Sequence, residues 1–322
     1  MKHKFLLNLA LGLLILCQPV AAKPASRVVI GAGNAGGGYF LIGAAICEQV
    51  NLGTGSHNVR CAVEPSKGTV VNLQALRDGH INLALAQSDW LHHAYAGTAA
   101  KFSGAGKVPE LRALLSLTAS PLVLLSRADG AISGVNDLAG KRLDIGKPGT
   151  GRRAAADDLI ASLGWDLGKF KLASELDEEA AIAALCGGQI DVLALAGAIP
   201  DRGIAAALKA CPMAPVPVSG PAAARLIADK PYYSAVRIPA GAYPGLKGDL
   251  DSVGVRVILT ASSKLPESDA YAIVKSVAGN LDALRKLHPS LSGLNRKDLG
   301  RASISVPLHD GAARYYRETG KQ

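Results

Sequence analysis

Aromatic residues, clustered charges and long apolar runs are all scarce in this sequence. Phenylalanine, tryptophan and tyrosine together make up 4% of the chain, and its lysine and arginine residues are scattered along it. A nucleic-acid surface combines gathered cations with aromatic side chains, so we expect no nucleic-acid partner. A membrane span needs about 20 consecutive apolar residues, and beyond the N-terminal segment no stretch reaches that length without charge or proline. These absences predict a soluble protein that binds or transforms something other than nucleic acid.

Motifs for metal binding and catalysis are missing as well. No Cys-x-x-Cys pair occurs, and the histidines lack the spacing of zinc ligands. His92 and His93 are adjacent, so on a helix they would point to different faces, and we expect both to be solvated. No serine lies in a Gly-x-Ser-x-Gly elbow, and no lysine follows a glycine loop at Walker spacing. We therefore expect no metal, no cofactor and no catalytic residues, and we predict that the protein is not an enzyme.

The N-terminus has the pattern of a secretory signal. Lys2 and Lys4 give a basic start, residues 5–16 are almost entirely apolar, and Val20-Ala21-Ala22 offers small residues for cleavage. A basic start, a short apolar run and a small-x-small site are typical of a signal peptide. We predict a signal peptide over residues 1–22, cleavage near Ala22, and a mature protein in the periplasm.

The remaining chain is too long for one compact core and suits two lobes, because domains usually contain about 100–150 residues. The formal net charge is +9. A basic balance fits anionic ligands, and general surface charge explains it equally well.

Four cysteines follow the predicted signal peptide, and an even number in an oxidising compartment indicates disulfides. Cys47 lies near the end of a predicted helix and Cys61 in the next predicted strand. Cys186 and Cys211 flank one strand–helix unit. We predict the pairs Cys47–Cys61 and Cys186–Cys211, although spacing alone does not fix the connectivity.

Short β-branched runs alternate with Ala/Leu-rich helical patterns along the whole chain. Such alternation predicts an α/β fold with mostly parallel sheets and helices on both faces. The predicted strands are 27–30, 59–63, 82–87, 112–117, 122–126, 142–145, 190–195, 235–238 and 254–260. The predicted helices are 38–50, 70–78, 88–96, 153–163, 178–185, 200–210 and 267–287.

Two strands are expected to link the two lobes. Residues 112–126 have the pattern of two strands separated by Ala119-Ser120-Pro121, because proline interrupts a β-ladder. We place one crossing there, and the apolar strand 253–260 is the candidate for the return. Lobe 1 then contains 27–118 and 255–322, and lobe 2 contains 119–254. Two lobes on a hinge of two crossing strands are typical of proteins that close around ligands.

The sharpest local pattern is the glycine-rich turn 31–38, which lies between a predicted strand and a predicted helix. Free backbone N–H groups and the positive end of a helix dipole suit an anion. The turn also matches Gly-x-Gly-x-x-Gly, the dinucleotide fingerprint, but the acidic residue expected about 20 positions on is Glu64, 33 residues after Gly31. An anion site is therefore favoured, and a dinucleotide site or a purely structural turn remain alternatives. The candidate ligand contacts in this turn are Asn34, Gly36, Gly37 and, at the helix start, Tyr39.

Two further helix starts carry candidate residues. In the turn 146–153, Thr150 is a plausible helix cap, and Arg153 can grip a carboxylate with two hydrogen bonds, unless it is simply solvated. Arg152 is a weaker candidate. Ligands of parallel sheets lie beyond the carboxyl ends of the strands. Gln87 and Ser88 fall at such a strand end and are candidate ligand contacts. The hydroxyl of Thr69 is expected to face the same cleft.

Nearly the whole mature chain resembles the TAXI family, periplasmic binding components of certain TRAP transporters. The segments that carry the resemblance are 31–39, 68–73, 78–79, 85–89, 111–117, 137–142, 149–153, 238–245 and 307–312. Each is weak alone, and their order and spacing are specific together.

The resemblance implies a two-lobed periplasmic-binding-protein fold and delivery of a ligand to an integral membrane permease driven by an ion gradient. It implies a small organic anion as ligand, such as glutamate, a 2-oxoglutarate-like dicarboxylate or another amino acid. The family's pocket maps onto Tyr39, Gln87, Ser88 and Thr150, and less directly onto Asn34, Thr69 and Arg153. The chain departs from the family at Arg152, which replaces a threonine and adds a positive charge, and at Phe40-Leu41.

The sequence therefore predicts a monomeric solute-binding protein that captures a small organic anion between its lobes. An exported enzyme that uses the same cleft, or a ligand sensor read by a membrane receptor, remains an alternative.

Overall fold

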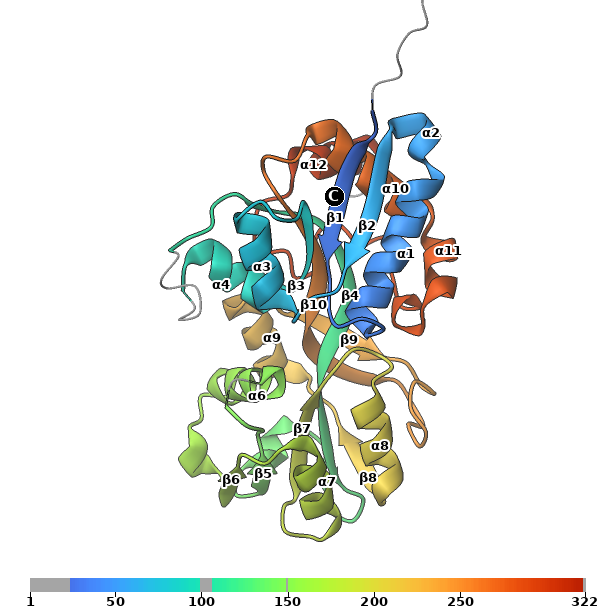
Figure 1. Cartoon of the computed structure of the whole chain (residues 1–322). Coiled ribbons are helices and arrows are strands. Elements are labelled where there is room, and N and C mark those ends of the chain that lie inside the picture. Colours follow the sequence, from blue (N-terminus) through green and yellow to red (C-terminus); the bar gives the residue numbers. More distant parts are fainter. Residues whose placement is uncertain (1–23, 99–105, 149, 321–322) are drawn as a thin grey trace, which may run out of the picture.

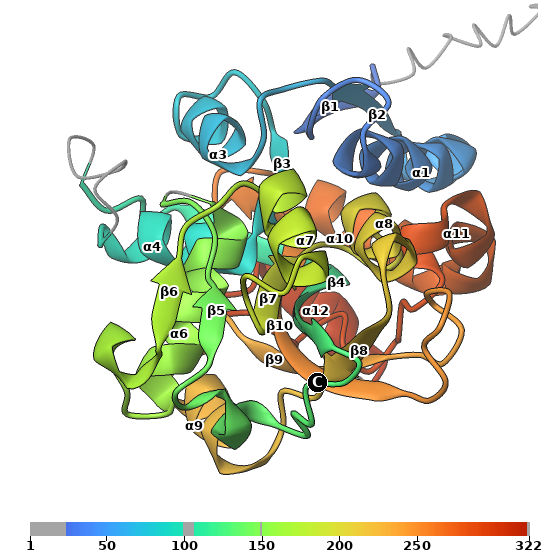
Figure 2. The same ribbon diagram turned by 90° about the horizontal axis from the view of Figure 1, so that it is seen from below.

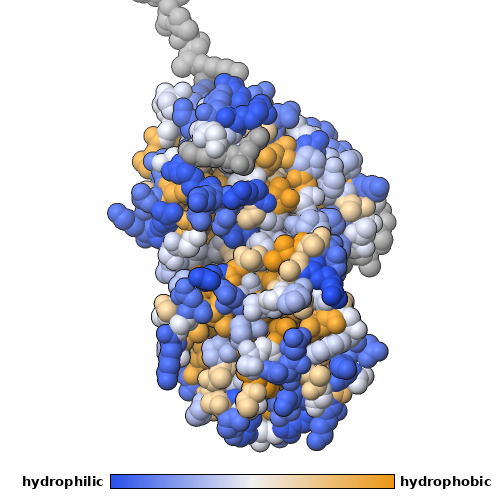
Figure 3. All heavy atoms as spheres, turned by 180° about the vertical axis from the view of Figure 1, so that it is seen from behind, coloured by the Kyte–Doolittle hydropathy of each residue, from blue (hydrophilic) through white to orange (hydrophobic). Residues whose placement is uncertain are grey.

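The computed structural model describes residues 24–98, 106–148 and 150–320, so the predicted signal peptide lies outside the described residues. The chain forms two α/β lobes joined at a waist, seen as a ribbon in Figure 1 and in outline from behind in Figure 3. In the order of the sheet the strands are β2-β1-β3-β10-β4-β7-β5-β6, while β8 pairs with β4 and β9 with β10. The predicted two-lobed α/β fold is thus the fold of this chain.

Lobe 1 consists of β1, β2, β3, the first half of β4, the second half of β10 and the helices on them. Strand β3 lies inside this sheet, and its residues Leu83, Ala84, Leu85 and Ala86 have no exposed surface. A strand covered on both faces is expected to be uniformly apolar. Helices α1, α10, α11 and α12 pack on one face, while α3 and α4 pack on the other. The elements are β1 (Ser26–Gly31), α1 (Gly38–Leu52), α2 (Thr54–His57), β2 (Val59–Glu64), α3 (Thr69–Arg77), β3 (Leu83–Gln87), α4 (Ser88–Ala96), α10 (Glu267–Gly279), α11 (Leu281–Leu287) and α12 (Asp310–Glu318).

Lobe 2 repeats the three-layer arrangement around β5, β6, β7, β8 and the second half of β4. Seen from below, α7 and α8 cover one face of this sheet, and α6 and α9 cover the other (Figure 2). The elements are β5 (Arg142–Asp144), α6 (Gly151–Ser162), β6 (Leu172–Ser174), α7 (Glu178–Cys186), β7 (Val192–Ala196), α8 (Arg202–Ala210), β8 (Met213–Val216), α9 (Gly220–Asp229) and β9 (Ser234–Ile238).

Two long antiparallel strands, β4 (Leu111–Arg127) and β10 (Leu250–Ser262), run through the waist. The predicted break at Ala119–Pro121 is wrong, because β4 is continuous there. Pro121 lies opposite Gly254 of β10, and the ladder of β4 with β7 begins only at Leu122. A Cβ atom at Gly254 would lie 2.7 Å from Pro121 Cα, so only glycine permits this close approach. The proline thus falls where β4 changes partners and leaves the strand intact.

Several other elements differ from the prediction. The helix predicted over 267–287 is two helices, α10 and α11, separated at Asn280. The strands β6 and β8 and the helices α9 and α12 were not predicted. Among the described residues, no helix is both long and apolar enough to cross a membrane. The residue boundaries predicted for the lobes stay a prediction.

Both predicted disulfides are confirmed. Cys47 of α1 is bonded to Cys61 of β2. Cys186, the last residue of α7, is bonded to Cys211 after α8. Each bridge lies within one lobe, so neither restricts movement of the lobes against each other.

Candidate binding site

The glycine-rich turn between β1 and α1 lies at the carboxyl end of the lobe 1 sheet, at the waist. The backbone N–H of Gly37 donates to the carbonyl oxygen of Asn34 at 2.8 Å, which closes the turn. Gly36 has φ +75°, a left-handed conformation that favours glycine. Asn34 and Gly36 are exposed and Gly37 precedes the first residue of α1. The turn therefore presents backbone at a helix N-terminus, the arrangement that suits an anion.

Tyr39 lies in the first turn of α1, where it packs against the main apolar core of lobe 1. Burial, together with the charge of Asp89 at the start of α4, raises the pKa of the Tyr39 hydroxyl. The tyrosine is therefore neutral and can donate a hydrogen bond. Its closeness to Asp89 places the starts of α1 and α4 at the same end of the sheet.

Thr69 and Gln87 are in direct contact. The backbone N–H of Gln87, the last residue of β3, donates to Thr69 Oγ1 at 3.2 Å. Asn72, one turn further along α3, donates to the carbonyl oxygens of Ala32 at 2.6 Å and Leu85 at 2.9 Å. This buried amide holds the glycine-rich turn, α3 and β3 together. The lobe 1 candidates thus form one cluster at the carboxyl ends of adjacent strands.

Ser88 differs from the other candidates because it has no exposed surface. Its hydroxyl donates to the carbonyl oxygen of Tyr232 at 2.7 Å and accepts from the backbone N–H of Arg256 at 3.0 Å. Tyr232 belongs to the turn after α9 of lobe 2, whereas Arg256 lies in the lobe 1 half of β10. The hydroxyl therefore connects the lobes, and the position does not fit the direct ligand contact predicted for it.

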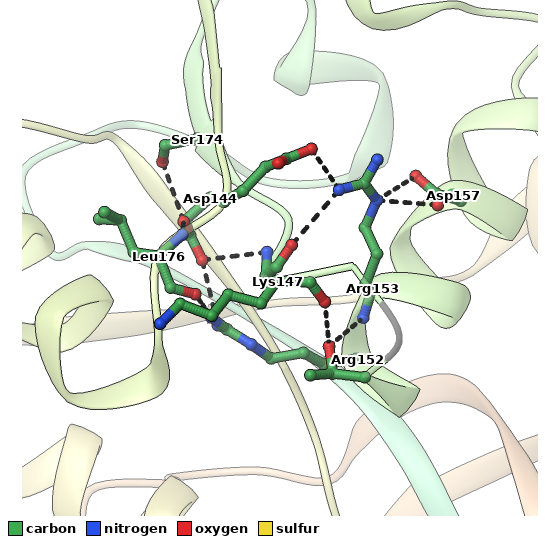
Figure 4. Close-up of polar contacts among 10 residues, drawn as sticks. Asp144, Lys147, Arg152, Arg153, Asp157, Ser174 and Leu176 are labelled. Atoms are coloured by element: carbon green, nitrogen blue, oxygen red, sulfur yellow. Dashed lines mark hydrogen bonds and ion pairs between the residues drawn. The ribbon is translucent and has the colours of Figure 1, made fainter.

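Thr150 and Arg153 lie at the start of α6 in lobe 2. Thr150 caps this helix, since its hydroxyl accepts from the backbone N–H of Arg153 at 3.3 Å and donates to the carbonyl oxygen of Lys147 at 2.7 Å. The guanidinium of Arg153 is 2.8 Å from Asp157 Oδ2 and also contacts Glu175 Oε1 (Figure 4). Two carboxylates of the same lobe thus already hold the arginine that was predicted to bind the ligand.

Arg152 is part of the interior of lobe 2 and does not face the cleft. It lies 3.1 Å from Asp144 Oδ1, and both side chains are buried. The guanidinium also donates to the carbonyl oxygens of Ala194, at 3.0 Å, and Leu176. The interpretation that this arginine adds positive charge to the pocket is therefore wrong. Its charge is balanced by Asp144, whose carboxylate also accepts from Ser174 and Leu176 (Figure 4). The pair thus links β7 to the ends of β5 and β6.

Gly146 owes its identity to this arginine. It has φ +84°, and a Cβ atom there would lie 2.5 Å from Arg152 Nε. The glycine lets the guanidinium pass over the turn that leads to α6. The predicted binding turn, 146–153, is thus held against the interior of lobe 2 by the contacts among Asp144, Gly146 and Arg152.

The charges of two aspartates, Asp89 on α4 of lobe 1 and Asp158 on α6 of lobe 2, act on each other across the waist. Burial, and to a smaller degree the charge of Asp158, raise the pKa of Asp89 to about 6. Asp89 Oδ1 is buried and has no hydrogen-bond partner. Asp158 is held by Lys230 at 2.5 Å and by the Tyr233 hydroxyl at 3.0 Å. The lobes therefore contact each other through charged and aromatic groups that the sequence analysis did not select.

Little in the sequence could have identified these groups. Tyr232 and Tyr233 follow a proline in a chain with few aromatic residues, which was a usable signal. The partners of Arg152 and Lys230 are set by the tertiary fold, and no local pattern reveals them.

The dinucleotide alternative depends on Glu64. This residue ends β2 and pairs in register with Gly31 of the glycine-rich turn. The end of β2 therefore lies beside the turn despite the long spacing in sequence, and the alternative has to be tested with NAD. Among residues 24–98, 106–148 and 150–320, no group of three or more His, Cys, Asp or Glu side chains could hold a metal ion.

A cavity of about 290 Å³ lies at the opposite end of lobe 1. Its floor is apolar and includes Leu76, Ile81 and Leu111, and its rim carries Arg77 and Lys264. It adjoins the amino end of β3, so it is separate from the predicted cleft.

Two α/β lobes joined by two long strands, with helix starts gathered at the waist of each lobe, define the periplasmic-binding-protein fold. A family model described as the NMT1-like family matches residues 30–320. The protein therefore belongs to the NMT1-like family.

A solved structure shows the same fold. The chain is similar to a TctC solute binding protein from Polaromonas, with 16% sequence identity, coverage of 94% of this chain and 100% of that chain, and a TM-score of 0.57. It is also similar to the periplasmic aliphatic sulphonate binding protein SsuA from Escherichia coli, with 15% identity, coverage of 84% and 80%, and a TM-score of 0.48.

Proposed function

We propose that this protein is an extracytoplasmic solute-binding protein that captures a small organic anion between its lobes. The observation that carries the proposal is the set of helix N-termini at the waist. In lobe 1, α1, α3 and α4 all start at the carboxyl ends of β1, β2 and β3, and in lobe 2 α6 starts after β5. Each start offers backbone N–H groups and a positive dipole end to an anion.

In the proposed complex, the ligand lies between the glycine-rich turn and the start of α6. Backbone N–H groups of Gly36 and Gly37, with Asn34 and Tyr39, contact it from lobe 1 beside Thr69 and Gln87. Thr150 and Arg153 contact it from lobe 2, once Arg153 exchanges Glu175 for the ligand carboxylate. Lobe closure then requires contacts that exist only in the closed state. The lobes are proposed to divide near residues 118 and 255.

The TAXI resemblance supports a TRAP-type permease as the partner and glutamate, 2-oxoglutarate or a related anion as the ligand. The two intralobe disulfides support an oxidising compartment. We therefore place the mature protein in the periplasm as a monomer, after cleavage near Ala22. A ligand sensor would use the same cleft but dock on a receptor.

Thermal unfolding of the ligand-stripped protein against dicarboxylates, amino acids, 2-oxoacids, alkanesulfonates and NAD tests the proposal. A ligand at 100 times its dissociation constant adds about 2.7 kcal/mol to the free energy of unfolding. A raised midpoint with a carboxylate supports anion capture, and calorimetry then gives the affinity. A raised midpoint with NAD alone would replace the proposal by the dinucleotide alternative. Turnover of a bound compound would replace it by an enzyme.

A further inference from the structure

His92 and His93 of α4 both lie against Tyr232, which belongs to lobe 2. The Tyr232 ring centroid is 5.1 Å from that of His92 and 5.5 Å from that of His93, and the two imidazoles are 5.6 Å apart. Neighbouring residues of a helix diverge by about 100°, so both can touch one ring only where that ring lies between them. Both histidines are partly buried, and the prediction that they are solvated is wrong.

The backbone that carries Tyr232 is fixed to lobe 1. Its carbonyl oxygen accepts from Ser88 Oγ, and the same oxygen atom of Ser88 accepts from the N–H of Arg256 in β10. Ser88 is the first residue of α4, so the hydrogen bonds and the histidines act from one helix. The turn between α9 and β9 is thus attached to lobe 1 at its backbone and at its side chain.

The same turn is fixed to lobe 2 from the other side. Lys230 Nζ lies 6.0 Å from the centre of the Tyr232 ring and donates to Asp158 of α6. Tyr233 donates to the other carboxylate oxygen of Asp158, and both tyrosines pack in the apolar core of α6 and α9. The turn is therefore held in lobe 2 by hydrogen bonds and apolar packing, and its contact with α4 couples the two lobes.

We propose that His92, His93 and Tyr232 form a clamp that holds the lobes together without touching ligand, and that the clamp opens when the histidines gain protons. The three are positioning residues of the binding protein. Their effect on ligand retention rests on the proposed function, whereas the clamp itself is a property of the fold.

The hydrogen bonds at the histidines explain the response to protons. His92 Nδ1 is buried and has no hydrogen-bond partner, so a proton on it would lack an acceptor. His93 Nδ1 lies 2.7 Å from the Thr98 hydroxyl. Burial, and then the neighbouring imidazole, lower the pKa of His92. Burial lowers the pKa of His93, which Asp158 raises in part and Lys230 lowers further.

The direction of the pH effect on the clamp follows from these lowered pKa values. The clamp favours neutral imidazole, so its strength is complete above the ordinary histidine pKa of about 6.5 and is lost as pH falls from there through the lowered values. Asp89 acts the other way, because its protonation near pH 6 removes the repulsion from Asp158. Tyr232 and Tyr233 have raised pKa values and stay neutral throughout. Variants must therefore separate the histidines from Asp89.

The test uses the full mature protein without ligand, so its failure is distinct from failure of the anion-binding proposal. The radius of gyration from small-angle X-ray scattering is measured at pH 8 and pH 5, with hydrogen exchange of residues 230–234 corrected for intrinsic pH effects. The double variant His92→Phe/His93→Phe keeps the rings but cannot titrate. His80→Gln is the matched control, since His80 is exposed beyond the end of α3.

We expect the natural protein and His80→Gln to expand at pH 5 and the double variant to stay compact. Tyr232→Ala is expected to be expanded at both pH values, while Tyr232→Phe, which keeps the ring, behaves as the natural protein. Circular dichroism confirms that each variant is folded. Equal expansion of the double variant and the natural protein at pH 5 would overturn the proposal, and so would a compact Tyr232→Ala protein at pH 8.

Discussion

Arg152 and Asp144 form a buried ion pair in lobe 2, with 3.1 Å between Nη1 and Oδ1. The pair packs against the predicted binding turn and links β7 to the ends of β5 and β6. The arginine that distinguishes this chain from the TAXI pattern is thus a structural residue.

The variant Arg152→Met is expected to be strongly destabilised. It leaves the Asp144 carboxylate buried without its cation, and breaking a buried pair in this way costs about 3–5 kcal/mol. Chemical denaturation gives the free energy of unfolding. Arg225→Met is the control, because Arg225 makes one hydrogen bond to a helix carbonyl oxygen in the same lobe. Equal loss in both variants would show that the Asp144 pair has no special role.

Glu175→Gln is expected to tighten binding of an organic anion. Glu175 contacts the Arg153 guanidinium, and a neutral amide competes less well with a ligand carboxylate for it. Calorimetric titration with the compound that raises the midpoint in the thermal screen measures the affinity. Glu179→Gln, on an exposed site in α7, controls for the change in net charge. An unchanged affinity in Glu175→Gln would remove Arg153 from the proposed site.

Asp89→Asn is expected to raise the free energy of unfolding at pH 7.5 more than at pH 4.5. The pKa of Asp89 is raised to about 6, so its ionisation opposes folding as pH rises from about 4 to 6. The shift corresponds to about 3 kcal/mol. Denaturation at both pH values, with Asp282→Asn on the exposed start of α11 as control, measures the difference. An identical pH dependence of stability in the variant and the natural protein would contradict the raised pKa of Asp89.

Ser88→Ala is expected to lower stability by about 1–3 kcal/mol, because it leaves a carbonyl oxygen and an N–H group without a partner at the waist. The affinity for an anion should change through the lobe equilibrium, with increased exchange at residues 230–234. Loss of affinity with unchanged stability and exchange would instead support the direct ligand contact predicted from the sequence.

Local patterns were enough for the α/β alternation, the two disulfides and most strands. In parallel β–α units, apolar strands, glycine-rich turns and helices follow one another in a regular succession. The positions of the lobe 1 loops could therefore be predicted from the sequence. The continuity of β4 through Pro121 was not accessible, because it depends on Gly254 more than a hundred residues away. A proline in a strand is tolerated or not according to its partner.

The candidate site shows the same division. Thr69 and Gln87 meet because the loop after β2 passes over the end of β1 and brings the start of α3 to the end of β3. The partners of Arg152, Arg153 and Ser88 come from separate segments, and each partner changes the role of its residue. Charged and hydroxyl groups at helix starts could be located from the sequence, but whether each faces a ligand or a neighbour could not.

The passage of β10 between β3 and β4 also favours an order of assembly as the chain emerges, N-terminus first, into the compartment where it folds. The lobe 1 sheet lacks a central strand until residues 250–262 have emerged, and Tyr316 must arrive before its hydroxyl can bond the Leu114 carbonyl oxygen. The β5–β8 sheet needs only the segment in between. The middle of the chain can therefore finish folding first, while the unpaired edge of β3 waits. A partly emerged chain with such an open edge is prone to wrong pairing, which a holding chaperone would prevent.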